Sequence, residues 1–345
     1  MTSFRSWRAI VRTLLMVSTL CLSIGPAAVF AQEATPAASP AAITFAHPAL
    51  GASAWLRAQQ DASGGFPGYN GDLDAGVTTD AVLALYAVQV GDPDASLALD
   101  KAVTWLEENG AAYAQTGAGQ AAKLALAAIA GGENPDAFAG QDLFALMETP
   151  STATVEHPIE GIWGDSIYTH ALVIMAFAAA NQPIPDSAIE PLRSTQSVDG
   201  GWAFDGSTGE GAADSNTTSM VIQALVAAGF GESEMIPAAL GFLETLKAAD
   251  GGYAYGPGEP LAADANSTAL VLQALIATDQ DSTGAMTALE GFQLPDGSLR
   301  YQSTDTEANL LATVQGIPAL AGQPLPVAVA CEGDAAGEGC VLLAA

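Results

Sequence analysis

The sequence has little positive charge, few cysteines and few histidines. It contains 9 lysines and arginines against 38 aspartates and glutamates, which gives a formal net charge of −29. Because so acidic a surface repels phosphate backbones, we expect no nucleic-acid partner. Two interpretations of the charge stay open, namely attraction to cations or basic ligands and simple solubility.

The few cysteines and histidines make a metal site unexpected. The histidines are His47, His157 and His170, and none has the spacing of a metal-binding motif. We therefore expect no metal and no cofactor. Cys331 and Cys340 flank a turn-rich loop, and in an oxidising compartment they should form a disulfide that pins the tail 321–345. On the chain-entropy model this bond would add about 2–3 kcal/mol of stability.

The first 31 residues predict an export signal. Three arginines precede an uncharged, mostly apolar run over 13–30, and small residues at Val29 and Ala31 suit a signal peptidase. An uncleaved membrane anchor is the alternative. Residues 32–46 are rich in Ala, Pro and Ser and predict a flexible tether. We expect a secreted or cell-surface protein, whose mature chain has lost three basic residues and no acidic one.

A short motif recurs at intervals of roughly 45 to 50 residues, which is typical of stacked supersecondary units. Its fullest copy is Gln196 followed by Gly200, Gly201 and Trp202. Weaker copies begin at Lys247 and at Gln293, and an earlier one runs from Gln60 to Phe66.

The spacing of apolar residues predicts twelve helices and almost no strand, so the fold class is all-α. The expected ranges are 47–60, 78–90, 94–109, 117–130, 136–147, 166–181, 186–194, 215–228, 233–246, 265–278, 283–292 and 306–319. Some helices, such as 215–228 from Ser219 onward, are apolar all round and should be buried. Others, such as 233–246 from Ala238 onward, have one apolar and one polar face and should lie outside. Six buried and six outer helices in alternation would close as a double ring.

These repeats resemble the QW repeats of the squalene cyclase and prenyltransferase superfamily, that is, of the terpenoid cyclase toroids. The resemblance implies an (α/α)6 toroid over 47–320, a fold shared with the protein prenyltransferases, the complement thioester domains and the cobalamin carriers. Lys247 replaces a glutamine, Phe66, Tyr253 and Leu299 replace a tryptophan, and the repeats near Asn109 and Glu148 show no motif. We interpret the repeat residues as structural, because paired glycines allow a tight reversal, aromatic rings wedge between helices and glutamine amides bond to backbone groups. They are Gln60, Phe66, Gln196, Trp202, Tyr253 and Gln293.

A second recurring element opens the buried helices, whose starts should all face one mouth of the ring. It reads Asp214-Ser-Asn-Thr-Thr218 and Asp264-Ala-Asn-Ser-Thr268, and an offset of 48 places Tyr168 and His170 in the same frame. One interpretation is an acidic ligand site at this mouth, and the other is helix N-capping by Asp, Asn, Ser and Thr. The ligand-site candidates are Tyr168, His170, Asp214, Asn216, Thr218, Asp264, Asn266 and Thr268.

Catalysis finds little support in the sequence. Class II terpenoid cyclases protonate the substrate with the middle aspartate of a D-x-D-D run, and this chain has Asn216 and Asn266 there, which have no such proton to give. Asp72-Leu-Asp74 has two aspartates in a related frame, and Asp72 and Asp74 are therefore the candidates for a catalytic acid. The cysteine that the zinc set of the prenyltransferases or the thioester domains would need is absent from the barrel.

The sequence therefore favours a secreted, monomeric and non-catalytic toroid that binds a small ligand or an extracellular protein at its acidic mouth. A terpenoid cyclase or mutase acting on an isoprenoid is one alternative. A cell-surface interaction module that uses the outer helices is the other.

Overall fold

The computed structural model describes residues 47–148, 159 and 161–326, all within the unit Ala42–Ala345. In this part of the chain the secondary structure is helical, with isolated bridges in the loops and no strand. The elements are α1 (Pro48–Ala58), α2 (Ala75–Val88), α3 (Pro93–Asn109), α4 (Ala111–Ala114), α5 (Ala118–Ala130), the 3-10 helix η1 (Phe138–Gly140), α6 (Leu143–Glu148), α7 (Ile167–Ala179), α8 (Asp186–Ser194), α9 (Ser215–Ala227), α10 (Met235–Thr245), α11 (Ala265–Ala277), α12 (Thr283–Gly291) and α13 (Leu310–Leu320).

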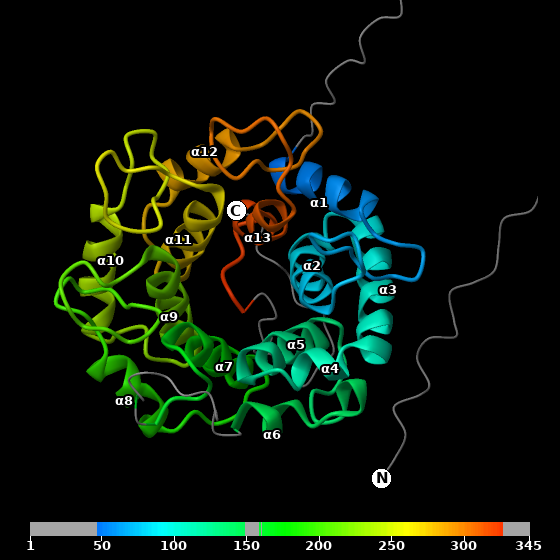
Figure 1. Cartoon of the computed structure of the whole chain (residues 1–345), viewed down its shortest axis with the longest axis horizontal. Helices are drawn as coiled ribbons and strands as arrows, with labels where there is room; N and C mark the ends of the chain where they lie inside the picture. The colour runs from blue at the N-terminus through cyan, green and yellow to red at the C-terminus, as the bar shows by residue number, and fades with distance from the viewer. Residues whose placement is uncertain (1–46, 149–158, 160, 327–345) are drawn as a thin grey trace, which may run out of the picture. The chain divides into compact units, whose positions relative to one another are not determined.

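Six of these helices form a closed inner ring. Taken in the order α2, α5, α7, α9, α11 and α13, each packs against the next, and α13 packs against α2. Figure 1 shows α1, α3, α6, α8, α10 and α12 around the outside of this ring. The predicted all-α toroid is therefore confirmed for the described residues.

The described residues hold thirteen α-helices instead of the predicted twelve. The expected helix over 136–147 is divided into η1 and α6, because Ala139 and Gly140 have φ values of 53° and 68° and cannot continue a helix. The short helix α4 precedes α5. The last inner helix begins at Leu310 instead of residue 306, because Asn309 caps it through its side chain.

Most inner helices end in the same way. Five of them are followed by a residue in the left-handed conformation, after which the next backbone N–H bonds back to the carbonyl of a residue in the last turn. The left-handed residues are Gly132, Asn181, Gly229, Asp279 and Gly322. This termination keeps these five inner helices short, at 11 to 13 residues, and reverses the chain toward the next element.

The repeat glutamines join each repeat to the next one. Gln196 Nε2 donates to the carbonyl of Gly200 at 2.7 Å and to that of Met235, at the start of α10, at 2.9 Å. Gln293 makes the same pair of bonds, to Gly297 at 2.9 Å and to Pro48 at 2.8 Å. Because Pro48 begins α1, the bond from Gln293 closes the ring between the last repeat and the first.

The first glycine of each motif lets the loop approach the next outer helix. Gly297 has a φ of +95°, and a Cβ there would collide with the carbonyl oxygen of Gly51 in α1. Gly200, with a φ of +93°, has the same relation to the Ala238 carbonyl. Both positions therefore need glycine, for its conformation and for its lack of a side chain.

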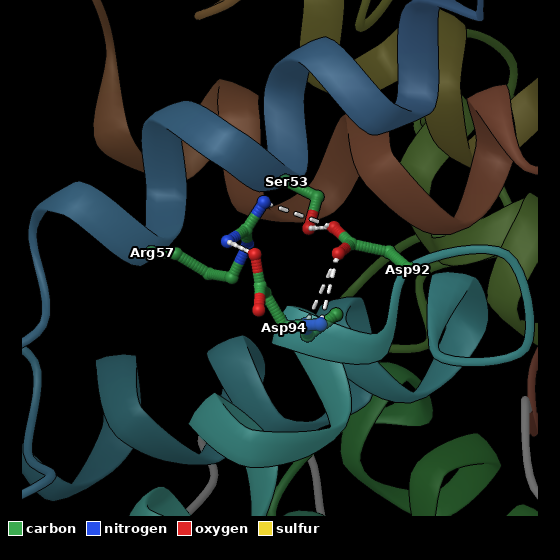
Figure 2. Close-up of polar contacts among 5 residues, drawn as sticks. Ser53, Arg57, Asp92 and Asp94 are labelled. Atoms are coloured by element: carbon green, nitrogen blue, oxygen red, sulfur yellow. Dashed lines mark hydrogen bonds and ion pairs between the residues drawn. The ribbon is translucent and has the colours of Figure 1, made fainter. Parts of the chain in front are cut away.

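A polar cluster links α1 to the start of α3 (Figure 2). Asp92 caps α3, and its carboxylate also accepts from Ser53 at 3.1 Å and pairs with Arg57 at 3.1 Å. Arg57 reaches Asp94 at 3.4 Å as well. The cluster lies on the outer layer, which gives it a structural role between two outer helices.

Several sequence predictions lie outside the described residues. They are the signal peptide, the tether and the bond between Cys331 and Cys340, and they remain predictions. Within the described ranges, no helix is long and apolar enough to cross a membrane. The same residues contain no cluster of three or more His, Cys, Asp or Glu side chains that could hold a metal ion.

Replacing Gln293 with leucine should loosen the closing seam. The change keeps the side chain's size but removes both donors, so the Gly297 and Pro48 carbonyls lose a partner, and we expect a loss of about 1–3 kcal/mol in the free energy of unfolding. Chemical denaturation of both proteins measures it. Lys247→Leu is the matched control, because Lys247 occupies the same repeat position, is exposed and bonds through its side chain to Glu244. Equal effects of the two changes would contradict this role.

Candidate binding site in the ring

The inner helices present one residue each to the hollow of the ring at the same level. Each helix has a cap residue directly before it, and these are Asp74, Gly117, Ser166, Asp214, Asp264 and Asn309. The residues six positions after the caps, which we call the cap+6 layer, all line one central cavity. They are Asp80, Lys123, Leu172, Met220, Leu270 and Gln315.

Two members of the cap+6 layer are charged, and they pair with each other. Lys123 Nζ forms an ion pair with Asp80 Oδ1, and the side chains are only 26% and 16% exposed. Burial alone would lower the pKa of Lys123, but the attraction of Asp80, with smaller contributions from Tyr113 and Tyr168, raises it above its usual value. Lys123 thus stays protonated, and the ion pair with Asp80 balances its charge on the cavity wall.

Two tyrosines stand near this pair. Burial raises the pKa of Tyr113 to about 12, and burial raises that of Tyr168 too, so both phenols stay protonated at neutral pH. Tyr168 lines the cavity, two positions after its cap, and its ring centroid is 6.5 Å from that of Phe204. Phe204 is 53% exposed, so the tyrosine lies between the cavity and the mouth of the ring.

The remaining walls are mostly apolar. Around the charged pair, Leu83, Leu126, Val314, Pro318 and Leu325 line the cavity, and Gln273 adds an amide. The volume of this cavity is about 60 Å³. A narrow crevice next to it, of about 20 Å³, runs between α2 and α13 and includes Tyr69 and Asp80. The site therefore combines apolar walls with one compact polar cluster, which is typical of small-molecule pockets.

The predicted acidic residues act as helix caps in the structure. Asp214 Oδ1 accepts from the Thr217 N–H at 2.7 Å, and Asp264 Oδ1 accepts from the Ser267 N–H at 2.8 Å. Burial raises the pKa of both carboxyls. Asp74 caps α2 in the same way, while Asp72 is exposed and bonds to Asn70. These geometries favour the capping interpretation, and they place neither Asp72 nor Asp74 in the cavity lining.

The candidates four positions after the caps also use their polar side-chain atoms in hydrogen bonds within the fold. The Thr218 hydroxyl accepts from the Trp202 N–H at 2.9 Å, and that of Thr268 accepts from the Tyr253 N–H at 3.0 Å. His170 takes the same position in α7, where its Nδ1 accepts from the Trp163 N–H at 2.9 Å and its Nε2 donates to the Ala188 carbonyl at 2.7 Å. His170 is fully buried and has no ring nitrogen left for a ligand.

Two sequence candidates lie at or next to the cavity, Tyr168 and Asn266. Tyr168, Asn216 and Asn266 share the position two residues after the cap. Tyr168 lines the cavity, and Asn266 donates through Nδ2 to Oε1 of Gln315, a cavity residue, at 2.5 Å. Asn216 accepts from the Ser215 hydroxyl at 3.3 Å. Of the predicted set, Tyr168 is thus in the cavity lining and Asn266 contacts it through Gln315.

Sequence reasoning missed Asp80, Lys123, Gln273 and Gln315. A signal was present, because Asp80 and Lys123 are single charges inside runs of apolar helix. It also missed Trp163, which serves as the aromatic of the repeat near Glu148 by donating its N–H to His170. That copy is hard to see because a histidine replaces the threonine.

Comparisons with known proteins give the fold. No family model and no curated protein matches the sequence. Among solved structures, the type II terpene cyclase MstE from Scytonema is 17% identical with a TM-score of 0.57, covering 79% of this chain and 96% of that one. A protein from Actinoplanes is 16% identical with a TM-score of 0.59 over 80% and 98% of the chains. The GH76A alpha-1,6-mannanase from Salegentibacter sp. HEL1_6 is 10% identical with a TM-score of 0.57, also over 80% and 98%. Likeness at these identities shows an α/α toroid and leaves the activity open.

Replacing one partner of the Asp80–Lys123 pair should destabilise the fold more than replacing both partners with apolar residues. Lys123→Met leaves a carboxylate without a partner in a mostly apolar cavity, and we expect a loss of about 3 kcal/mol of stability. The double variant Asp80→Leu with Lys123→Met should regain most of that loss, because no charge stays behind. Denaturation of the wild type, both single variants and the double variant measures the coupling. A double variant as unstable as Lys123→Met would contradict the buried pair.

His170 should make the protein less stable as the pH falls from about 6.5 toward 4. Burial lowers the pKa of His170 to about 4, so the unfolded chain binds the proton more readily than the folded one throughout that window. At pH 5 the resulting loss of folding free energy is about 2 kcal/mol relative to pH 7. Unfolding at both pH values, in the wild type and in His170→Gln, measures it. The same pH dependence in both proteins would show that His170 is not responsible.

Proposed function

We propose that this chain is a binding protein that takes a neutral amphiphilic small molecule into the hollow of its ring. The observation that carries the proposal is the cap+6 layer, in which one self-neutralised ion pair lies on an otherwise largely apolar wall. A ligand with an apolar body and a hydroxyl or amide head matches this arrangement. Its head would exchange hydrogen bonds with Asp80, Lys123 and Tyr168.

The charges of the Asp80–Lys123 pair disfavour a ligand whose polar head is itself charged. An anion beside the pair would leave one uncompensated negative charge in the cavity, inside a protein whose net charge is already −29. A cation would leave one positive charge beside Lys123. A neutral head adds no charge and can both donate to the carboxylate and accept from the ammonium or the phenol.

Terpene cyclisation is the second candidate, because the fold is shared with the type II terpene cyclase MstE. A class II cyclase needs a carboxylic acid that gives up a proton, and the cavity's carboxylate, Asp80, is engaged by Lys123. Glycoside hydrolysis needs two carboxyl groups across the scissile bond, and Asp80 is the single carboxylate among the described cavity residues. The described cavity residues do not supply the groups that either reaction needs, and this supports binding over catalysis.

We further propose that the protein works outside the cytoplasm as a monomer, after removal of the predicted signal peptide. An extracellular protein partner on the outer helices is an alternative to the small ligand. N-terminal sequencing of the exported chain tests the first point, and cleavage after Ala31 is the expected result.

Three ten-carbon probes test the head-group preference. 1-Decanol should bind saturably and raise the melting temperature, because binding to the folded state stabilises it, whereas decanoate and decyltrimethylammonium should bind at least tenfold more weakly. Titration calorimetry on the purified protein measures all three. Leu270→Phe, which fills the cap+6 layer, should abolish decanol binding, while the matched control Leu97→Phe, on the exposed outer surface, should leave it intact.

Two results would contradict the proposal. One is the absence of saturable decanol binding in wild type and in every variant. The other is equal affinity for the three probes together with indifference to Leu270→Phe, since it would indicate nonspecific apolar binding. Formation of a cyclised product from an isoprenoid diphosphate or alcohol would favour the cyclase instead.

A further inference from the structure

The chain leaves α13 and turns back into the ring. Gly322 adopts a φ of +69°, and Gln323 N–H bonds to the Pro318 carbonyl at 2.9 Å, which ends the helix and reverses the chain. Figure 1 shows the segment after α13 running into the middle of the ring. We call residues 322–326 the strap.

Two buried glutamines on inner helices hold the strap. Gln273 Nε2 donates to the Gln323 carbonyl at 2.9 Å, and Gln223 Oε1 accepts from the Leu325 N–H at 2.7 Å. Both glutamines are nine positions after their caps, on α11 and α9, and both are at most 2% exposed. Since Pro324 and Pro326 have no N–H, the Leu325 N–H is the only backbone donor over 324–326, and it is the one that Gln223 binds.

The strap separates two cavities. Leu325 lines the central cavity with the cap+6 layer, and it also lines a second cavity of about 410 Å³. The second cavity lies between the ends of α7, α9 and α11, where its lining includes Ala179, Ala227 and Ala277. With a rise of 1.5 Å per residue, the cap+6 layer and these helix ends are about 10 Å apart, so the strap crosses the ring between them.

The central cavity is too small for the ligand that its walls suit. About 60 Å³ accommodates a few water molecules, whereas the apolar body of an amphiphile needs several times that space. The larger cavity lies directly beyond Leu325, along the axis of the ring. Withdrawal of the strap would join the two spaces and would leave the amides of Gln223 and Gln273 facing the enlarged chamber.

We propose that the strap is an internal occupant of the ligand site, which an elongated neutral amphiphile displaces. This inference rests on the proposed function. The polar head of the ligand would lie at Asp80, Lys123 and Tyr168, and its apolar chain would pass the level of Gln223 and Gln273 into the second cavity. Ligand binding and strap docking are then mutually exclusive, so the strap lowers the apparent affinity and any partner that draws it out raises it.

Hydrogen exchange at the Leu325 amide tests this exclusion in the full chain. In the free protein the amide is bonded to Gln223, and we expect saturating 1-decanol to accelerate its exchange. The double variant Gln223→Met with Gln273→Met removes both bonds at nearly constant volume. We expect it to exchange quickly without ligand and to bind decanol about tenfold more tightly than wild type, since two hydrogen bonds no longer hold the competitor.

Two further variants keep the test interpretable. Leu325→Ala weakens the strap without touching the inner helices, and it should tighten decanol binding in the same direction. Gln115→Met with Gln280→Met changes two exposed glutamines and should change neither exchange nor affinity. Decanol bound with Leu325 still protected, or unchanged affinity in both strap variants, would overturn the inference and leave the proposed function standing. Absence of decanol binding in wild type and all variants would overturn both.

Discussion

A single hydrogen bond, repeated around the ring, sets the register of the inner helices. In five of the six inner helices, a side chain four positions after the cap accepts the N–H of the residue at the aromatic position of the loop before it, as Thr78 does for Phe66 and Thr313 does for Leu299. The exception is α5, which has Ala121 at this position. Three of these loops also bond to the preceding inner helix. The carbonyls of Phe204, Tyr255 and Tyr301 accept from the first N–H of α7, α9 and α11, respectively. Every inner helix whose loop makes these bonds is therefore fixed in height and in rotation.

The layers of the candidate binding site follow from that register. Residues two, six and nine positions after a cap fall on one side of an α-helix, since each residue turns the helix by about 100°. Once the starts of the inner helices are level, these positions form successive layers around the hollow. The first layer holds Tyr168 and Asn266, the second holds Asp80 and Lys123, and the third holds the glutamines that bind the strap. Chemistry can thus change at these positions without disturbing the repeat.

The ion pair is the feature of this hollow on which the proposed binding function rests. Lys123 engages the cavity's carboxylate, Asp80, in an ion pair, whereas proton-initiated cyclisation would require a free acid there. A buried pair of this kind contributes little net stability compared with apolar residues of the same size. Its presence on an otherwise largely apolar wall is better explained by recognition of a polar group than by stabilisation of the ring.

The sequence allowed the toroid to be predicted because its determinants are local and repeated. The glutamine, the glycine pair and the aromatic recur in order, and apolar and amphipathic helices alternate along the chain. The site was harder, because residues such as Thr218 and His170 stand at conspicuous helix starts yet bond to the backbone of a loop. Asp80 and Lys123 come from different helices, and only the closed ring brings them together. The strap was treated as part of a tail, since its partners, Gln223 and Gln273, are 102 and 50 residues away.

The most direct test of this account is a crystal structure of the protein bound to 10-bromo-1-decanol, in which the anomalous signal of bromine locates the far end of the chain. We predict the hydroxyl within hydrogen-bonding distance of Asp80 or Tyr168 and the bromine beyond the level of Gln223 and Gln273, where the strap otherwise lies. Bromine at the outer helices or at the exposed mouth, with the strap still docked on both glutamines, would contradict it.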